Sequence, residues 1–245
     1  MSDFETIKAG GTRLSYRRRK GRGPTIVFLP GYMSDMEGGK AAALDAWAAA
    51  EGRAMLRFDY AGCGASEGDF EAQSLARWRD DVLAMLDLVV EGPALLVGSS
   101  MGGWLMLLAA LARPERVAGL VGIASAPDFT SWGFTDEQKR TIREDGRLEE
   151  ASPYGEQPSV TTRTFWESGE TLKLLDGEIA VDCPVRLLHG LADPDVPWRI
   201  SLAILKRVRS SDVQAALVKG GDHRLSRPQD ITLLIATVCA LLESP

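Results

Sequence analysis

Short apolar runs alternate with helix-like segments along most of the chain, and this rhythm most constrains its fold. The strand-like runs lie at 25–29, 54–58, 94–97, 117–123, 185–188 and 213–218. The helix-like segments lie at 39–51, 74–90, 101–113, 198–208 and 229–242. Near-continuous apolar strands separated by helices form a mostly parallel sheet that is covered on both faces. We therefore predict an α/β fold with a mostly parallel, doubly wound sheet.

Two departures from this rhythm add detail to the predicted fold. Alternating residues at 4–9 and 13–18, joined by Gly10 and Gly11, predict an N-terminal antiparallel hairpin. Between 127 and 181 polar and aromatic residues mix without a strong apolar run, and a loop this long in a compact domain is usually functional. We predict a core at 1–126 and 182–245 and a small, partly helical lid inserted at 127–181.

Aromatic residues are spread through the predicted lid. They are Trp132, Phe134, Tyr154, Phe165 and Trp166. These side chains would either shape an apolar pocket for an acyl group or pack together only to stabilise the insertion. Of these two roles, we expect the first, in which the aromatic side chains shape an acyl pocket.

Charge and cysteine content exclude several classes of protein. The 245 residues include 28 Lys and Arg against 34 Asp and Glu, a net charge of −6, which argues against a nucleic-acid partner or an anionic membrane surface. The three cysteines, Cys63, Cys183 and Cys239, are widely spaced and form no zinc-type cluster, so neither a disulfide framework nor a structural metal site is predicted. They fit a reducing compartment.

Two stretches bear on location. Residues 93–112 carry no charge and are about as long as a membrane span, but the segment 98–103 (Gly-Ser-Ser-Met-Gly-Gly) divides them. We predict a strand, a turn and a buried helix there, and no membrane span. The N-terminus is acidic and shows no leader pattern, so a cytoplasmic location is expected.

A G-x-S-x-G motif at 98–102 lies between an apolar strand and a helix, which is the context of a nucleophile elbow. Ser100 is the predicted nucleophile. A sharp strand-to-helix turn needs small residues two before and two after the nucleophile, and Gly98 and Gly102 supply them. With Ser99 as nucleophile, those places would hold Val97 and Met101, which are too bulky.

Backbone N–H groups near Ser100 could bind an oxyanion. Met101 presents its N–H at the positive end of the following helix. The second donor should come from the loop after the strand at 25–29, where Gly31 permits close backbone approach and Tyr32 offers its N–H.

The acid and the base that would act with Ser100 are expected in the loops that follow the last strands. Asp193 follows the strand at 185–188 and is the preferred acid, with Asp128 and Asp195 as alternatives. The chain has only two histidines. His223 follows the last strand and gives the order Ser, Asp, His, so it is the preferred base. His189 ends a strand and is interpreted as a structural residue beside the Asp193 loop.

Five segments in this order resemble the α/β-hydrolase superfamily. They are 30–32, 59–66, 98–102, 189–197 and 221–223. Segments 98–106 and 186–198 are similar to a narrower branch, which contains a mitochondrial palmitoyl-protein thioesterase that also acts as an acyl-glucuronide esterase. That relative needs a targeting segment, whereas this chain begins almost at its first strand. The resemblance implies catalysis by Ser100, Asp193 and His223 without a metal or an organic cofactor.

These observations predict a serine hydrolase that cleaves carboxylic esters or thioesters through an acyl-serine intermediate. The expected partner is a small-molecule or acyl-protein substrate. The same triad could instead hydrolyse amide or carbon–carbon bonds. A noncatalytic ligand-binding protein on the same fold is a further alternative, because fold does not fix function.

Overall fold

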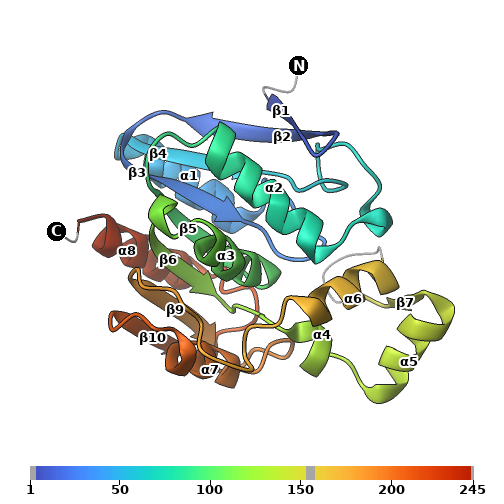
Figure 1. Ribbon diagram of the computed structural model, residues 1–245. Coiled ribbons are helices and arrows are strands. Elements are labelled where there is room, and N and C mark those ends of the chain that lie inside the picture. The colour runs from blue at the N-terminus through green and yellow to red at the C-terminus, as the bar shows by residue number, and fades with distance from the viewer. Residues whose placement is uncertain (1–3, 153–157, 244–245) are drawn as a thin grey trace.

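Within residues 4–152 and 158–243, which the computed structural model describes, an eight-stranded sheet runs through the middle of the molecule (Figure 1). Its strands are β1 (Glu5–Ala9), β2 (Thr12–Arg19), β3 (Arg22–Leu29), β4 (Arg53–Phe58), β5 (Ala94–Ser99), β6 (Val117–Ile123), β9 (Val185–Gly190) and β10 (Val213–Val218). They are ordered β1-β2-β4-β3-β5-β6-β9-β10. β1 pairs with β2 and β2 with β4 in antiparallel fashion, and the remaining pairs are parallel. The predicted parallel sheet with an N-terminal antiparallel hairpin is confirmed.

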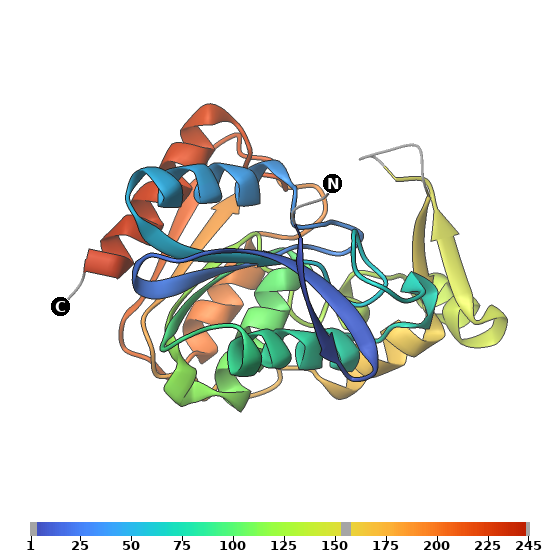
Figure 2. The same ribbon diagram turned by 90° about the horizontal axis from the view of Figure 1, so that it is seen from above.

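Helices cover both faces of the sheet, as Figure 2 shows from above. They are α1 (Gly39–Ala50), α2 (Leu75–Leu88), α3 (Met101–Ala112), α7 (Arg199–Arg207) and α8 (Pro228–Glu243). Two short 3-10 helices lie at Phe70–Ala72 and Pro114–Arg116. α1 and α8 pack on one face, and α2, α3 and α7 on the other.

The apolar strands are continuous because both of their faces are buried. Along β3, Ile26 and Phe28 contact the α1 and α8 layer, whereas Val27 and Leu29 contact the α2 and α3 layer. Successive side chains of a strand point to opposite faces, so a strand between two helical layers needs apolar residues at every position.

The segment between β6 and β9 carries the predicted insertion, 127–181. Its described elements are α4 (Phe129–Trp132), α5 (Asp136–Asp145), β7 (Arg147–Glu150), β8 (Ser159–Thr162) and α6 (Arg163–Thr171). They lie beyond the carboxyl ends of the parallel strands (Figure 1). The antiparallel pair of β7 and β8 was not expected from the sequence. Tyr154 lies outside the described residues. That 127–181 acts as a lid stays a prediction.

The uncharged stretch 93–112 forms β5, a turn and α3, as predicted. No helix in the described part of the chain is long and apolar enough to cross a membrane.

A buried carboxylate in α2 holds the loop that follows β4. Asp81 is 1% exposed and accepts a hydrogen bond from the Ala61 N–H at 2.8 Å. It also forms an ion pair with Arg77, with 2.9 Å between nitrogen and oxygen. Burial is the largest influence on this group, and it raises the pKa of Asp81 to about 6 even against the Ala61 and Arg77 contacts.

We expect Asp81→Asn to change how stability depends on pH. Because the pKa of Asp81 is higher in the folded chain, the native state binds the extra proton, and wild type loses stability as pH rises through this pKa. Relative to the variant, wild type should lose about 1 kcal/mol between pH 5 and pH 7. Urea unfolding at both pH values measures this, and a difference that stays constant would contradict the assignment.

Candidate active site

Ser100 stands at the junction of β5 and α3 in a strained backbone conformation. Its φ is +54° and its ψ is −118°, a region that residues with side chains rarely adopt. Its N–H donates to the Ile123 carbonyl at 2.9 Å, and its own carbonyl accepts from the Ala126 N–H at 3.1 Å. These two bonds to the end of β6 and the residues after it hold the turn in place.

The two glycines of the motif are required by close backbone contacts. A Cβ on Gly98 would lie 2.3 Å from the Gly102 carbonyl oxygen, and one on Gly102 would lie 2.0 Å from the Leu29 carbonyl oxygen. Both distances are far below van der Waals contact and involve backbone that cannot move aside. The structure thus places Gly98 and Gly102 where a tight turn around Ser100 needs them.

The loop after β3 packs directly against Ser100. A Cβ on Gly31 would lie 3.4 Å from the Ser100 Cβ, so this loop and the elbow are in contact. Tyr32 follows Gly31, and Met101 is the first residue of α3. Within the described residues, the Tyr32 N–H donates no backbone hydrogen bond in a turn, loop or cap. The Met101 N–H has no partner inside α3, because the first N–H groups of a helix have none. Both predicted donors therefore lie beside Ser100.

The predicted acid and base meet because their strands are neighbours. Asp193 follows β9 and His223 follows β10, which are adjacent and parallel. The Ala192 N–H donates to the Gly221 carbonyl at 2.9 Å, which joins the two loops. His223 Nδ1 lies 2.9 Å from Asp193 Oδ2.

Asp193 is buried and heavily hydrogen-bonded. Its side chain is fully buried, and Oδ1 accepts from the N–H groups of Asp195 and Val196, both at 2.9 Å. Burial alone would raise the pKa of this carboxyl, but hydrogen bonds from His189, His223 and Val196 outweigh burial and hold the pKa well below its usual range. Asp193 therefore stays ionised at neutral pH.

The alternative acids have other contacts. Asp128 is buried at φ +59°, and its two oxygens accept from the N–H groups of Leu174 and Leu175 at 2.8 and 2.7 Å. It fastens the end of the insertion, a role that the sequence did not indicate. Asp195 is exposed, and its N–H donates to Asp193.

Asp193, Asp195 and His223 also form a cluster whose ligand-type atoms lie within 4.8 Å of one another. Such a spacing would suit a cation. However, Asp193 Oδ1 already accepts two N–H groups and Oδ2 faces two imidazoles, so this carboxylate serves as a hydrogen-bond acceptor.

A pocket of about 280 Å³ opens beside Ser100 and His223. Its other walls come from the loop after β3, the start of α1 and the residues after His223, including Lys40 and Arg224. Lys40 Nζ donates to the Arg224 carbonyl at 2.6 Å, and burial lowers the pKa of Lys40 to about 8. No described residue of 127–181 lines this pocket, contrary to the expectation that the lid aromatics shape it.

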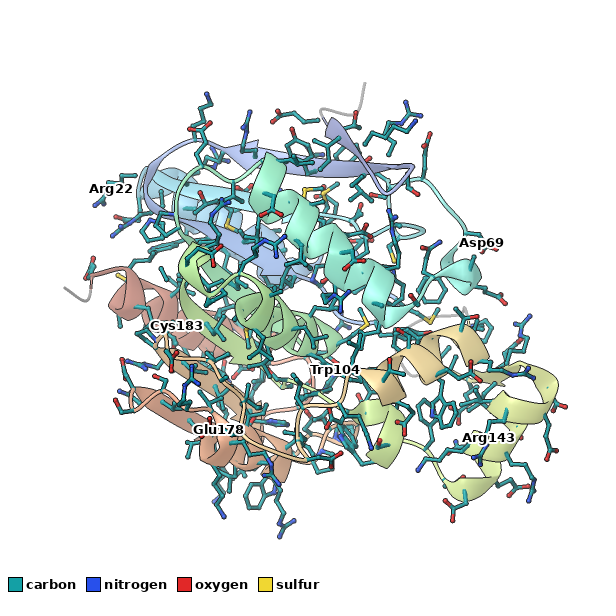
Figure 3. All side chains as sticks on the ribbon, in the orientation of Figure 1. Arg22, Asp69, Trp104, Arg143, Glu178 and Cys183 are labelled. Atoms are coloured by element: carbon teal, nitrogen blue, oxygen red, sulfur yellow. The ribbon has the colours of Figure 1, made fainter. Side chains whose placement is uncertain are left out.

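The insertion's aromatic residues instead pack against the core. Phe129 and Phe165 contact the Tyr32 ring, with centroids 6.1 and 4.7 Å away. Trp104 of α3, labelled in Figure 3, donates from Nε1 to the Leu172 carbonyl at 3.1 Å. The Tyr32 hydroxyl donates to the Val160 carbonyl of β8 at 2.6 Å. Tyr32 thus joins the loop after β3 to the insertion.

Known proteins are similar to this chain over nearly its whole length. A family model described as serine aminopeptidase, S33, matches residues 23–132, which include the loop after β3 and the turn at Ser100 but end before Asp193. Human palmitoyl-protein thioesterase ABHD10, mitochondrial, is 43% identical over 234 residues, which cover 94% of this chain and 76% of that protein. The rat protein of the same name is 45% identical over the same share of this chain and 79% of its own length.

Two solved structures agree with these sequence matches. Mouse alpha/beta hydrolase domain-containing protein 10 superposes with a TM-score of 0.92 at 42% identity, covering 99% of both chains. A putative hydrolase from Agrobacterium vitis S4 gives a TM-score of 0.93 at 39% identity, covering 98% of this chain and 99% of that one.

The comparisons contradict the expected cytoplasmic location, because the human and rat relatives are both named as mitochondrial proteins. The expectation depended on reduced cysteines and on the first residues of the chain. All three cysteines are free, but free thiols are compatible with any reducing compartment and do not single out the cytoplasm.

We expect Tyr32→Phe to loosen the insertion while keeping the ring and the backbone N–H. The variant loses the bond to Val160, which should cost about 1 kcal/mol of unfolding free energy and speed proteolytic cleavage within 127–181. Tyr16→Phe is the matched control, because its hydroxyl bonds Glu5 at 3.3 Å in the N-terminal hairpin. Equal cleavage rates in both variants would contradict the coupling.

Proposed function

Because the chain belongs to the α/β-hydrolase family that includes palmitoyl-protein thioesterase ABHD10, it is a serine hydrolase of ester or thioester bonds, and we propose that Ser100, His223 and Asp193 perform the hydrolysis. The observation that carries the assignment is the 2.9 Å contact between His223 and the buried, ionised Asp193, at a pocket that His223 shares with Ser100. A carboxylate in this position holds an imidazole in one tautomer and stabilises its protonated form.

The proposed reaction has two stages. Ser100 Oγ attacks the acyl carbonyl carbon and its proton passes to His223 Nε2, because Nδ1 faces Asp193. His223 then gives this proton to the leaving alcohol or thiol as the acyl-serine forms. In the second stage His223 takes a proton from water, the resulting hydroxide attacks the acyl-serine, and the carboxylic acid leaves as Ser100 regains its proton.

The backbone N–H groups of Tyr32 and Met101 are the proposed oxyanion donors. The contact between Gly31 and Ser100 and the position of Met101 at the start of α3 support this role. Two fixed donors stabilise the negative charge that develops on the carbonyl oxygen, and each such donor is worth roughly 3–4 kcal/mol in the transition state.

We propose an acyl thioester or ester as substrate, on a protein or on a small molecule, by analogy with relatives named as palmitoyl-protein thioesterases. Amide hydrolysis is the second candidate, because the matching family model is described as a serine aminopeptidase. Kinetics on matched acyl esters, thioesters and aminoacyl amides of several chain lengths separate the two candidates. The value of kcat/KM should be highest for the thioesters or esters under the first proposal and for the amides under the second.

Ser100→Ala tests the nucleophile. Removing the attacking oxygen should lower kcat by about 10⁴-fold or more and abolish labelling by a fluorophosphonate probe. Ser99→Ala is the matched control, because Ser99 ends β5 in the same motif, and this variant should still be labelled at residue 100. Retained turnover or labelling of Ser100→Ala would refute the proposed function.

Asp193→Asn and Asp128→Asn separate the acid from the structural carboxylate. Asp193→Asn should lower kcat by roughly 10³–10⁴-fold, because the imidazole loses its orienting charge. Asp128→Asn should cost about 1–3 kcal/mol of unfolding free energy, because an amide cannot accept both the Leu174 and Leu175 N–H groups, while kcat changes by less than about threefold. The reverse pattern would make Asp128 the acid.

A further inference from the structure

Both histidines of the chain contact the same oxygen of Asp193. His223 Nδ1 lies 2.9 Å from Oδ2, and His189 Nε2 lies 3.2 Å from the same atom. His189 is fully buried at the carboxyl end of β9, beneath the loop that carries Asp193. The acid of the proposed triad therefore has two imidazole neighbours, and the reaction as derived uses one of them.

The partners of His189 determine its tautomer. Nε2 faces Asp193 Oδ2 and, at 2.9 Å, the Val196 carbonyl, and both are acceptors only, so Nε2 carries the proton. Nδ1 lies 2.7 Å from the Ser201 hydroxyl of α7, which is 1% exposed. In this tautomer Nδ1 is the acceptor, and the Ser201 hydroxyl donates to it. Ser201 thus holds His189 so that its Nε2–H, which bonds the Val196 carbonyl, also lies close to Asp193 Oδ2.

We propose that His189, fixed by Ser201, is a positioning residue that restrains Asp193 and thereby sets the pH range in which His223 works as a base. The His189 N–H near Oδ2 offsets part of the negative charge on this oxygen, so Asp193 attracts the His223 ring less strongly than it would alone. With His189 in place, Asp193 therefore stabilises protonated His223 less strongly. This inference depends on the proposed triad.

Other charged groups lie in the same loops, in the same pocket or at the start of α7. Asp195 lies on the same loop within 4.8 Å of Asp193 and His223. Asp222 and Arg224 flank His223 in the chain, and Lys40 of α1 lines the same pocket. From the start of α7, Arg199 lies over the Trp198 ring, 4.6 Å from its centroid. All of these charged groups are unchanged in the variants described below, so a change in the pH profile of kcat/KM reports the loss of the His189 contact.

The test is the pH profile of kcat/KM between pH 5 and 9. Removing the donor with His189→Leu should move the midpoint of the acidic limb up by about half to one pH unit, because Asp193 then stabilises protonated His223 more strongly. Ser201→Ala should move it in the same direction by less. His189→Gln, whose amide N–H reaches the position of Nε2, should restore the wild-type limb.

Ser15→Ala is the matched control, since it removes a buried hydroxyl that donates to the Ala65 carbonyl and should leave the acidic limb unmoved. If His189→Leu does not fold, Ser201→Ala decides alone. An unmoved limb in the folded variants, or a loss of kcat equal at every pH, would overturn the inference while leaving Ser100 as nucleophile. Full activity of Ser100→Ala would instead refute the triad itself.

Discussion

The close backbone packing around the turn at Ser100 is the constraint on which the site depends. Gly98 and Gly102 lie so near to other backbone that a Cβ on either would overlap a carbonyl group. This packing presses the start of α3 against the end of β3, and Ser100 takes its positive φ within it. Because β3 and β5 are parallel neighbours, the loop after β3 meets Ser100 at the same place. One set of contacts thus fixes the strained serine and the loop after β3 together.

A second contact places Asp193 and His223, the proposed acid and base. β9 and β10 are adjacent and parallel, so the loops after them leave the same edge of the sheet. A Cβ on Gly190 would lie 2.2 Å from the Gly221 carbonyl oxygen, which shows how tightly these loops meet. The Asp193 carboxylate then contacts both His189 and His223 through its Oδ2. Its position comes from the sheet, and its ionisation comes from the hydrogen bonds that burial makes strong.

The sequence predicted what depends on periodicity and on local sterics. Apolar strands and helices fell where expected because burial on both faces leaves a clear pattern, and Gly98 and Gly102 marked the turn. The sequence placed His189 beside the Asp193 loop, but its contact with the Asp193 carboxylate could not be predicted, since that depends on the conformation of 191–196. The structural role of Asp128, which the sequence offered only as an alternative acid, could not be predicted either, because its partners Leu174 and Leu175 lie far along the chain. The pairing of β7 with β8 joins two short polar strands that lack an apolar pattern.

The insertion is attached to the site at both of its ends. Ala126, just before it, bonds the Ser100 carbonyl, and Asp128 fastens its far end at Leu174 and Leu175. Between these points, Tyr32 holds β8 through its hydroxyl and contacts Phe165 through its ring. Movement of β8 therefore acts on the residue that follows Gly31, whereas Asp193 and His223 rest on β9 and β10. Substitutions in the insertion would therefore act directly on Tyr32, whereas Asp193 and His223 would keep their geometry.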